Sequence, residues 1–150
     1  MTAQFARINA DRPACLILVG LHPKDARAAD GELRHGELAN LAAIHAAAFK
    51  ATAVVGQYGG ETAIVVPDLN ARTAPASLPQ FAEAMVKDAG RLGLSIQIAI
   101  GRVVPGLRSL RSTAGETASI LRCLRRNDHL TVGTLEDFET EIVLDEAVAA

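Results

Sequence analysis

The side chains of this sequence that most often bind metals or act as nucleophiles are four histidines and two cysteines. They are His22, His35, His45, His129, Cys15 and Cys123. No two histidines share a metal-ligand spacing, and the cysteines form no CxxC pair. One disulfide is conceivable, but two reduced thiols in a cytosolic protein are the expectation we favour. Motifs of the types GxSxG, HExxH, GxxxxGK[ST] and strand-associated GxGxxG are absent. We therefore expect no catalytic residue, no metal ligand and no cofactor.

His45 lies in the middle of the apolar face of a helix expected over residues 33–50. A histidine in such a position is more often a hydrogen-bonded core or edge residue than a catalytic base, so we favour that interpretation. His22 follows an apolar run and precedes Pro23, and we expect it to be a solvated turn residue.

Charged side chains are segregated near the end of the chain. Five arginines lie on one side of a helix expected over residues 107–126: Arg108, Arg111, Arg122, Arg125 and Arg126. Residues 136–146 hold six acidic groups and no basic one: Glu136, Asp137, Glu139, Glu141, Asp145 and Glu146. Two solvated surfaces are the favoured interpretation. The alternatives are that the acidic segment meets the arginine face, within one chain or across a dimer, or that this face binds a phosphate-bearing ligand.

A Gly-Gly pair gives the clearest local structural signal. Thr52–Tyr58 and Glu61–Pro67 are β-rich runs separated by Gly59 and Gly60. Two glycines readily adopt the positive φ angles of a two-residue type I′ turn. The pattern therefore predicts a tight β-hairpin.

The remaining elements follow from hydrophobic periodicity and capping signals. Ala14–Leu21 is a continuous apolar run typical of a strand buried on both faces. Further strands are expected over 95–100 and 129–133. A loop over 68–76 precedes a helix that Ser77 caps and Gly93 ends. Residue Thr134 should cap a final helical segment.

This order is β-α-β-β-α-β-α-β with a helical tail. It predicts an α/β (α+β) fold with a mixed, largely antiparallel sheet built on a ferredoxin-like βαββαβ core. Residues 1–12 are expected to be a lead-in and residues 13–150 a single domain.

Composition narrows the classes of partner. Hydrophobic residues make up 49% and charged residues 21%, which supports a real core rather than disorder. The net charge of −2 and the absence of Trp disfavour a nucleic-acid surface. No stretch approaches about 18 apolar residues, so we expect a cytoplasmic protein that does not enter a membrane.

The hairpin Tyr58-Gly59-Gly60-Glu61-Thr62-Ala63-Ile64-Val65-Val66-Pro67 resembles the RYGG[DE]EF-x-[IL]-[LV]-[LV]-P signature of GGDEF domains. That family includes the diguanylate cyclases, which join two GTP molecules into cyclic di-GMP. The resemblance implies that Gly59 and Gly60 admit the nucleotide phosphates and that Glu61 is a metal carboxylate.

The carboxylate set that this resemblance requires is incomplete. Thr62 and Ala63 replace the next acidic and aromatic positions. The second metal carboxylate is expected at the end of the first strand, where residues 19–22 read VGLH. The product-binding RxxD motif is replaced by KATA at residues 50–53. One carboxylate does not hold two metals, so we expect no cyclase activity.

A wider resemblance points to the GGDEF-like domain of PucR/CdaR-type bacterial transcriptional regulators, a degenerate relative of the cyclase domain. Residues 13–25, 98–111 and 134–138 match its opening strand, its "GvG-pv-Gl--L" run and its closing segment in order. The resemblance implies a non-catalytic signalling and dimerisation domain, with homodimers and other regulator domains as partners. DNA would be bound only through a helix-turn-helix, which does not follow residue 150, so the chain is an excised domain or a free-standing relative.

Two alternatives stay open. The chain could be a degenerate GGDEF domain that binds GTP or cyclic di-GMP through Gly59, Gly60 and Glu61 without cyclase activity. It could also be an unrelated ferredoxin-like module with an enzymatic site that no motif reveals.

Overall fold

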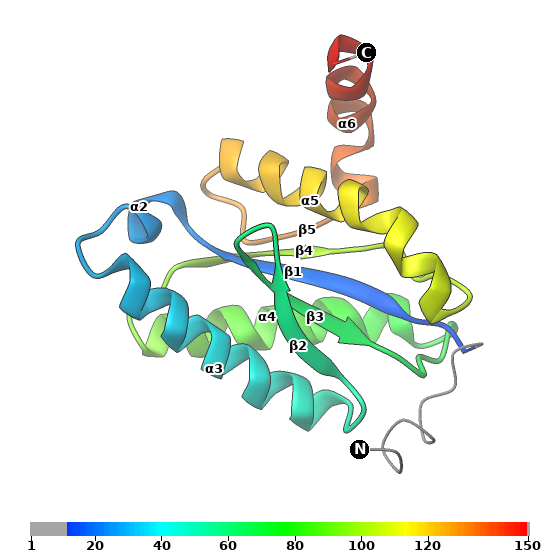
Figure 1. Cartoon of the computed structure of the whole chain (residues 1–150), viewed down its shortest axis with the longest axis horizontal. Coiled ribbons are helices and arrows are strands. Elements are labelled where there is room, and N and C mark those ends of the chain that lie inside the picture. The colour runs from blue at the N-terminus through cyan, green and yellow to red at the C-terminus, as the bar shows by residue number, and fades with distance from the viewer. Residues whose placement is uncertain (1–11, 150) are drawn as a thin grey trace.

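A computed structural model describes residues 12–149, which form alternating strands and helices (Figure 1). The strands are β1 (Cys15–Leu21), β2 (Val54–Tyr58), β3 (Glu61–Val66), β4 (Ile96–Ile100) and β5 (Val132–Thr134). The α-helices are α2 (Pro23–Ala26), α3 (Gly31–Phe49), α4 (Ala74–Arg91), α5 (Leu110–Arg126) and α6 (Leu135–Ala149). A short 3₁₀ turn, η1 (Leu107–Ser109), leads into α5.

The strands form one mixed sheet in the order β2-β3-β1-β4-β5. β1 lies antiparallel to both β3 and β4, and β2 lies antiparallel to β3. Only the pairing of β4 with β5 is parallel within residues 12–149, and it needs the crossover that α5 supplies. The predicted α/β class and the ferredoxin-like core are confirmed.

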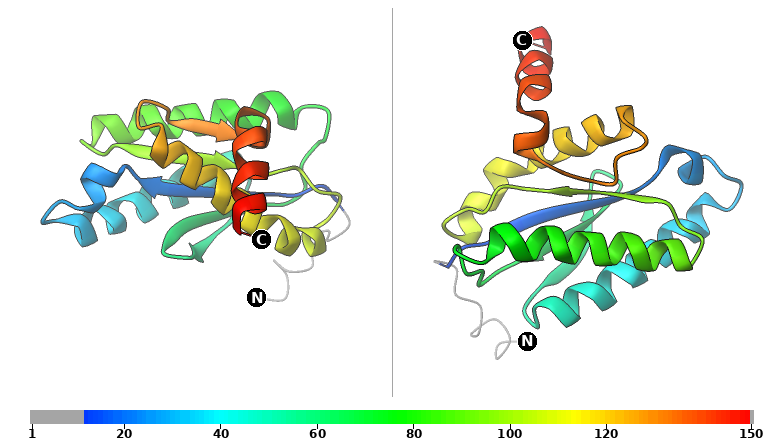
Figure 2. Two further views of the ribbon diagram at one scale, coloured as in Figure 1. Left: turned by 90° about the horizontal axis from the view of Figure 1, so that it is seen from above. Right: turned by 180° about the vertical axis from the view of Figure 1, so that it is seen from behind.

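Helices cover both faces of this sheet (Figure 2). On β1, Ile17 and Val19 face the core shared with α3 and α4, whereas Leu16 and Leu18 face α5. Because successive side chains of a strand point to opposite faces, a strand covered on both sides is apolar throughout. This explains the continuous apolar run over residues 14–21.

The predicted Gly-Gly turn is confirmed. Gly59 has φ 57° and Gly60 has φ 82°, both in the left-handed region that an I′ turn requires. Tyr58 pairs directly with Glu61, so the two strands leave the turn without a bulge.

Several boundaries differ from the sequence-based expectations. α4 begins at Ala74, and Thr73 rather than Ser77 is its N-cap. Pro75 fits the first turn because its missing N–H has no intrahelical partner there. β5 occupies 132–134 instead of 129–133, since a turn follows α5. Leu92, the C-cap residue of α4, is 56% exposed because the helix ends there.

α6 has two differently placed halves. Phe138 has a non-helical backbone (φ −129°, ψ 16°) that kinks the helix. Phe138 and Ile142 are buried beside α5, while the end of α6 projects from the body of the fold (Figure 1). Within residues 12–149, no helix combines the length and apolarity needed to cross a membrane. Of the predicted lead-in over residues 1–12, residues 1–11 lie outside the described part of the chain.

Candidate functional site

The first residue of β3, Glu61, forms an ion pair with Arg125 in the last turn of α5. Arg125 Nη2 donates a 2.6 Å hydrogen bond to Glu61 Oε1. The side chains are only 17% exposed for Glu61 and 31% for Arg125, so the pair is largely withdrawn from solvent. The hairpin places Glu61 at this point because β3 starts immediately after the Gly-Gly turn.

Gly20 on β1 lies directly beneath this ion pair. The β1–β3 register pairs Val19 with Thr62, which puts Gly20 next to Glu61. A Cβ at position 20 would lie 2.6 Å from Arg125 Nη2 and 2.6 Å from Glu61 Oε2. A side chain at position 20 would therefore require the ends of the Arg125 and Glu61 side chains to move.

Gln97 extends the same polar row into β4. It is fully buried, pairs with Gly20 across the strands, and its Nε2 donates to Leu124 O at 2.7 Å and Leu130 O at 3.0 Å. The row formed by Glu61, Gly20 and Gln97 is thus held against the C-terminal half of α5. We call it the polar row.

The polar row leaves two acceptor atoms without partners. Glu61 Oε2 and Gln97 Oε1 are buried and make no hydrogen bond among the described residues. A buried, unsatisfied acceptor costs free energy unless a donor or a cation meets it. Within residues 12–149, no group of three or more His, Cys, Asp and Glu side chains could hold a metal ion.

The structure brings Gly59, Gly60 and Glu61 together as neighbours in the turn. A Cβ on either glycine would meet nothing within 4 Å. The glycines therefore face open space, whereas Glu61 points inward to α5. Their nucleotide-binding role stays a prediction.

The five arginines do not form one continuous charged surface, because their side chains make different contacts. Arg125 turns to the sheet, Arg122 donates to Ser119 Oγ at 2.6 Å, and Arg126 lies 3.8 Å from Glu141. Arg108 and Arg111 are exposed. The Arg126–Glu141 pair is one contact between the acidic segment and the arginine face within a chain. The side chains of Asp145 and Glu146 lie outside the described part.

Three of the other candidate side chains, His45, Cys15 and Cys123, are partly or fully buried. His45 Nε2 lies 2.8 Å from Asp88 Oδ2 and joins α3 to α4, as expected of a hydrogen-bonded edge histidine. Cys15 and Cys123 are free and buried on opposite faces of the sheet. Burial raises the pKa of Cys15 to about 12, against a weaker opposing effect of the Gly101 backbone. Burial also raises the pKa of Cys123.

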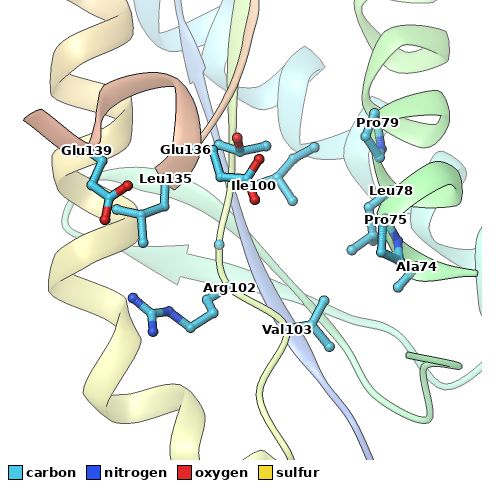
Figure 3. Close-up of a pocket in the computed structure, with 12 residues that line it drawn as sticks. Ala74, Pro75, Leu78, Pro79, Ile100, Arg102, Val103, Leu135, Glu136 and Glu139 are labelled. Atoms are coloured by element: carbon cyan, nitrogen blue, oxygen red, sulfur yellow. The ribbon is translucent and has the colours of Figure 1, made fainter. Parts of the chain in front are cut away.

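One hollow of about 530 Å³ was not anticipated from the sequence. It lies between the first turns of α4 and α6, at the carboxyl ends of β4 and β5 (Figure 3). Leu78 and Ile100 line its apolar part, and Arg102, Glu136 and Glu139 supply charge. Arg102 is already paired with Glu116 at 3.0 Å. The hollow joins separate segments, so no local motif marks it.

Comparison with protein families matches residues 2–123 to the GGDEF-like domain family. This range contains Gly20 and the complete hairpin, and it ends two residues before Arg125. No curated protein matches the chain. Since the match covers most of the sequence, the chain belongs to the GGDEF-like domain family.

Proposed function

We propose that this chain is a non-catalytic signalling domain of the type carried by PucR/CdaR transcriptional regulators. The family match and the order of the matching segments along the chain support this assignment. The Arg125–Glu61 ion pair above Gly20 is the observation that best supports the absence of catalysis in this proposal.

The chemistry of nucleotide cyclisation explains why this pair matters. Two divalent metals offset the triphosphate charge and activate the attacking hydroxyl, and they need carboxylates from two strands. Here Glu61 supplies one carboxylate, and residues 19–22 at the end of β1 supply none. A guanidinium already neutralises Glu61, so a metal ion would have to displace Arg125 from a partly desolvated position.

The same pair supports a role in signal transfer. It ties the hairpin to the end of α5, and α5 continues through β5 into α6. A displacement of the hairpin would therefore move the end of α5 and, through β5, the C-terminal helix α6. We place the domain in the cytoplasm, with a second copy and other domains of a regulator as partners. DNA contact would belong to a helix-turn-helix elsewhere in that regulator.

The direct test is a product assay. Purified protein is incubated with GTP and Mg²⁺ or Mn²⁺, and cyclic di-GMP is measured by chromatography beside an active cyclase as positive control. We expect no product above the protein-free blank. Cyclic di-GMP formed by the wild-type chain and lost in Glu61→Gln would overturn the proposal.

A second candidate, nucleotide binding without turnover, is favoured by one observation. Glu61 Oε2 is buried and has no hydrogen-bond partner among the described residues, so it could accept a donor or a metal. Isothermal titration with GTP and with cyclic di-GMP, both with Mg²⁺, separates the candidates. Submillimolar binding that Glu61→Gln abolishes supports this second function. Absence of binding heat with both ligands supports the first candidate, a signalling domain that does not bind these nucleotides.

A further inference from the structure

The strand β2 forms one edge of the sheet. It has β3 on one side and no strand of the described chain on the other, and β5 lies at the opposite edge (Figure 2). Proteins usually protect an edge strand with a charged residue, a proline or a β-bulge, because its free backbone groups otherwise pair with another strand. β2 carries none of these devices, since its sequence is VVGQY and it pairs with β3 residue for residue.

The free backbone groups of this edge belong to Val55 and Gln57. Tyr58 and Glu61 flank the two-residue turn, and residues in that position exchange hydrogen bonds. Hydrogen-bonded pairs alternate along an antiparallel ladder, so Gly56 also bonds to β3, whereas Val55 and Gln57 direct their N–H and C=O groups away from it. In the described chain, no turn or loop backbone bonds to either residue. Two donors and two acceptors are therefore free.

These free groups are complementary to a second copy of themselves. Val55 and Gln57 lie symmetrically about Gly56, so an antiparallel β2 centred on Gly56 would form two Val55–Gln57 pairs, each exchanging two hydrogen bonds. The same register sets Val54 of one copy opposite Tyr58 of the other, and these side chains are 54% and 42% exposed. Such a β-branched–aromatic pair stabilises neighbouring strands. Because β2 has no charged residue, two copies meet without like-charge repulsion within the strand.

The helix beside this edge, α3, has small side chains on its outer flank. His45 joins α3 to α4, and helix geometry places Gly36, Ala39 and Ala43 on the flank that turns away from α4. Gly36 and Ala43 are exposed, and Ala39 is half-buried. The twofold axis of an antiparallel strand pair is perpendicular to the sheet, so the α3 helices of two copies would be neighbours on one face. Small side chains allow such helices to approach closely.

We infer that β2 binds β2 of a second copy of this chain, antiparallel and centred on Gly56, so that the two sheets become one. A second copy is the occupant because the free backbone groups, the Val54–Tyr58 pairing and the small flank of α3 all match their own copies about one twofold axis. The inference rests on the proposed function, which includes a second copy, and names the surface that this copy uses.

Sedimentation of the full chain over a range of concentrations measures the dimer dissociation constant. Gly56→Lys places two lysines opposite each other at the twofold axis, and we expect it to raise the constant at least about tenfold. Gly90→Lys on α4 is the matched control and should leave the constant unchanged. Both glycines are exposed, neither has a positive φ, and a Cβ at either would meet nothing within 4 Å. Both variants should therefore fold, which thermal melting verifies.

Mixing variants of opposite charge tests the register. Gly56→Lys and Gly56→Glu should each dimerise poorly alone, and an equimolar mixture should regain dimers, because position 56 faces itself only in an antiparallel pair centred there. A wild-type chain that stays monomeric at all concentrations overturns the inference, as does a dimer that Gly56→Lys leaves intact. A mixture that stays monomeric overturns pairing centred on Gly56. The cyclase and titration assays are read independently of these results, so failure of this inference is distinguishable from failure of the proposed function.

Discussion

The guanidinium of Arg125 lies 2.6 Å from the carboxylate of Glu61, joining the last turn of α5 to the residue that follows the Gly-Gly turn. The two residues are 64 positions apart in the sequence. Glu61 occupies the position at which the resemblance to the GGDEF signature implies a metal carboxylate. The cation paired with it here is the guanidinium of Arg125. Four predictions follow from this site and from the elements around it.

The Arg125–Glu61 pair should stabilise the fold more than an exposed ion pair does. Arg125→Ala leaves a largely buried carboxylate without a cation, and we expect a loss of about 1–3 kcal/mol in the free energy of unfolding. Arg102→Ala is the matched control, because Arg102 is 57% exposed beside Glu116 and its loss should cost at most about 1 kcal/mol. Urea denaturation at neutral pH measures both. Equal losses would show that the Arg125 pair is an ordinary surface contact.

A second carboxylate at position 20 should create a metal site only if Arg125 is removed. Gly20→Asp alone would crowd Arg125 and Glu61, since a Cβ there lies 2.6 Å from both side chains. Gly20→Asp with Arg125→Ala places two carboxylates side by side without a competing cation. We expect Mn²⁺ to raise the melting temperature of the double variant but not of the wild type or Arg125→Ala. No shift in the double variant would contradict this geometry.

The turn should discriminate between residues that tolerate positive φ and those that do not. Gly59→Val puts a β-branched side chain at φ 57°, and we expect a loss of at least about 1 kcal/mol. Gly59→Asn should be far milder, because Asn-Gly is a preferred type I′ pair. A Cβ at position 59 would meet nothing within 4 Å, so the main difference expected between the two variants is in backbone conformation. Thermal melting of both variants checks it, and identical melting temperatures would rule out the I′ assignment.

Cys15 should contribute to loss of stability at alkaline pH. Burial raises its pKa from 9.0 to about 12, so the folded state keeps the proton while the unfolded thiol ionises above pH 9. Stability is thus retained below pH 9 and lost as pH rises toward 12, by about 1.4 kcal/mol per unit. Cys15→Ala should lose less stability than the wild type between pH 8 and 10.5 in urea denaturation. Parallel losses in the two proteins would show that Cys15 does not titrate with unfolding.

Short-range signals predicted much of this fold correctly. The apolar run over 14–21 indicated a strand covered on both faces, and the Gly-Gly pair indicated a two-residue hairpin; both features depend on local side chains and φ preferences. The start of α4 was misplaced because Ser77 resembles a cap. Ala74 is buried in the tertiary core, and Pro75 suits a first turn, so the helix starts earlier.

The sequence by itself determined the element order, the turn and the presence of a single carboxylate in the hairpin motif. Only the tertiary structure decided which arginine meets that carboxylate. Arg122, Arg125 and Arg126 are equivalent as a charged cluster, but the docking of α5 on the sheet turns Arg125 inward and leaves Arg122 and Arg126 more exposed. The pairing of β1 with β3 then brings Gly20 beneath it. Local propensity carries no information about such contacts, because they depend on how distant elements pack.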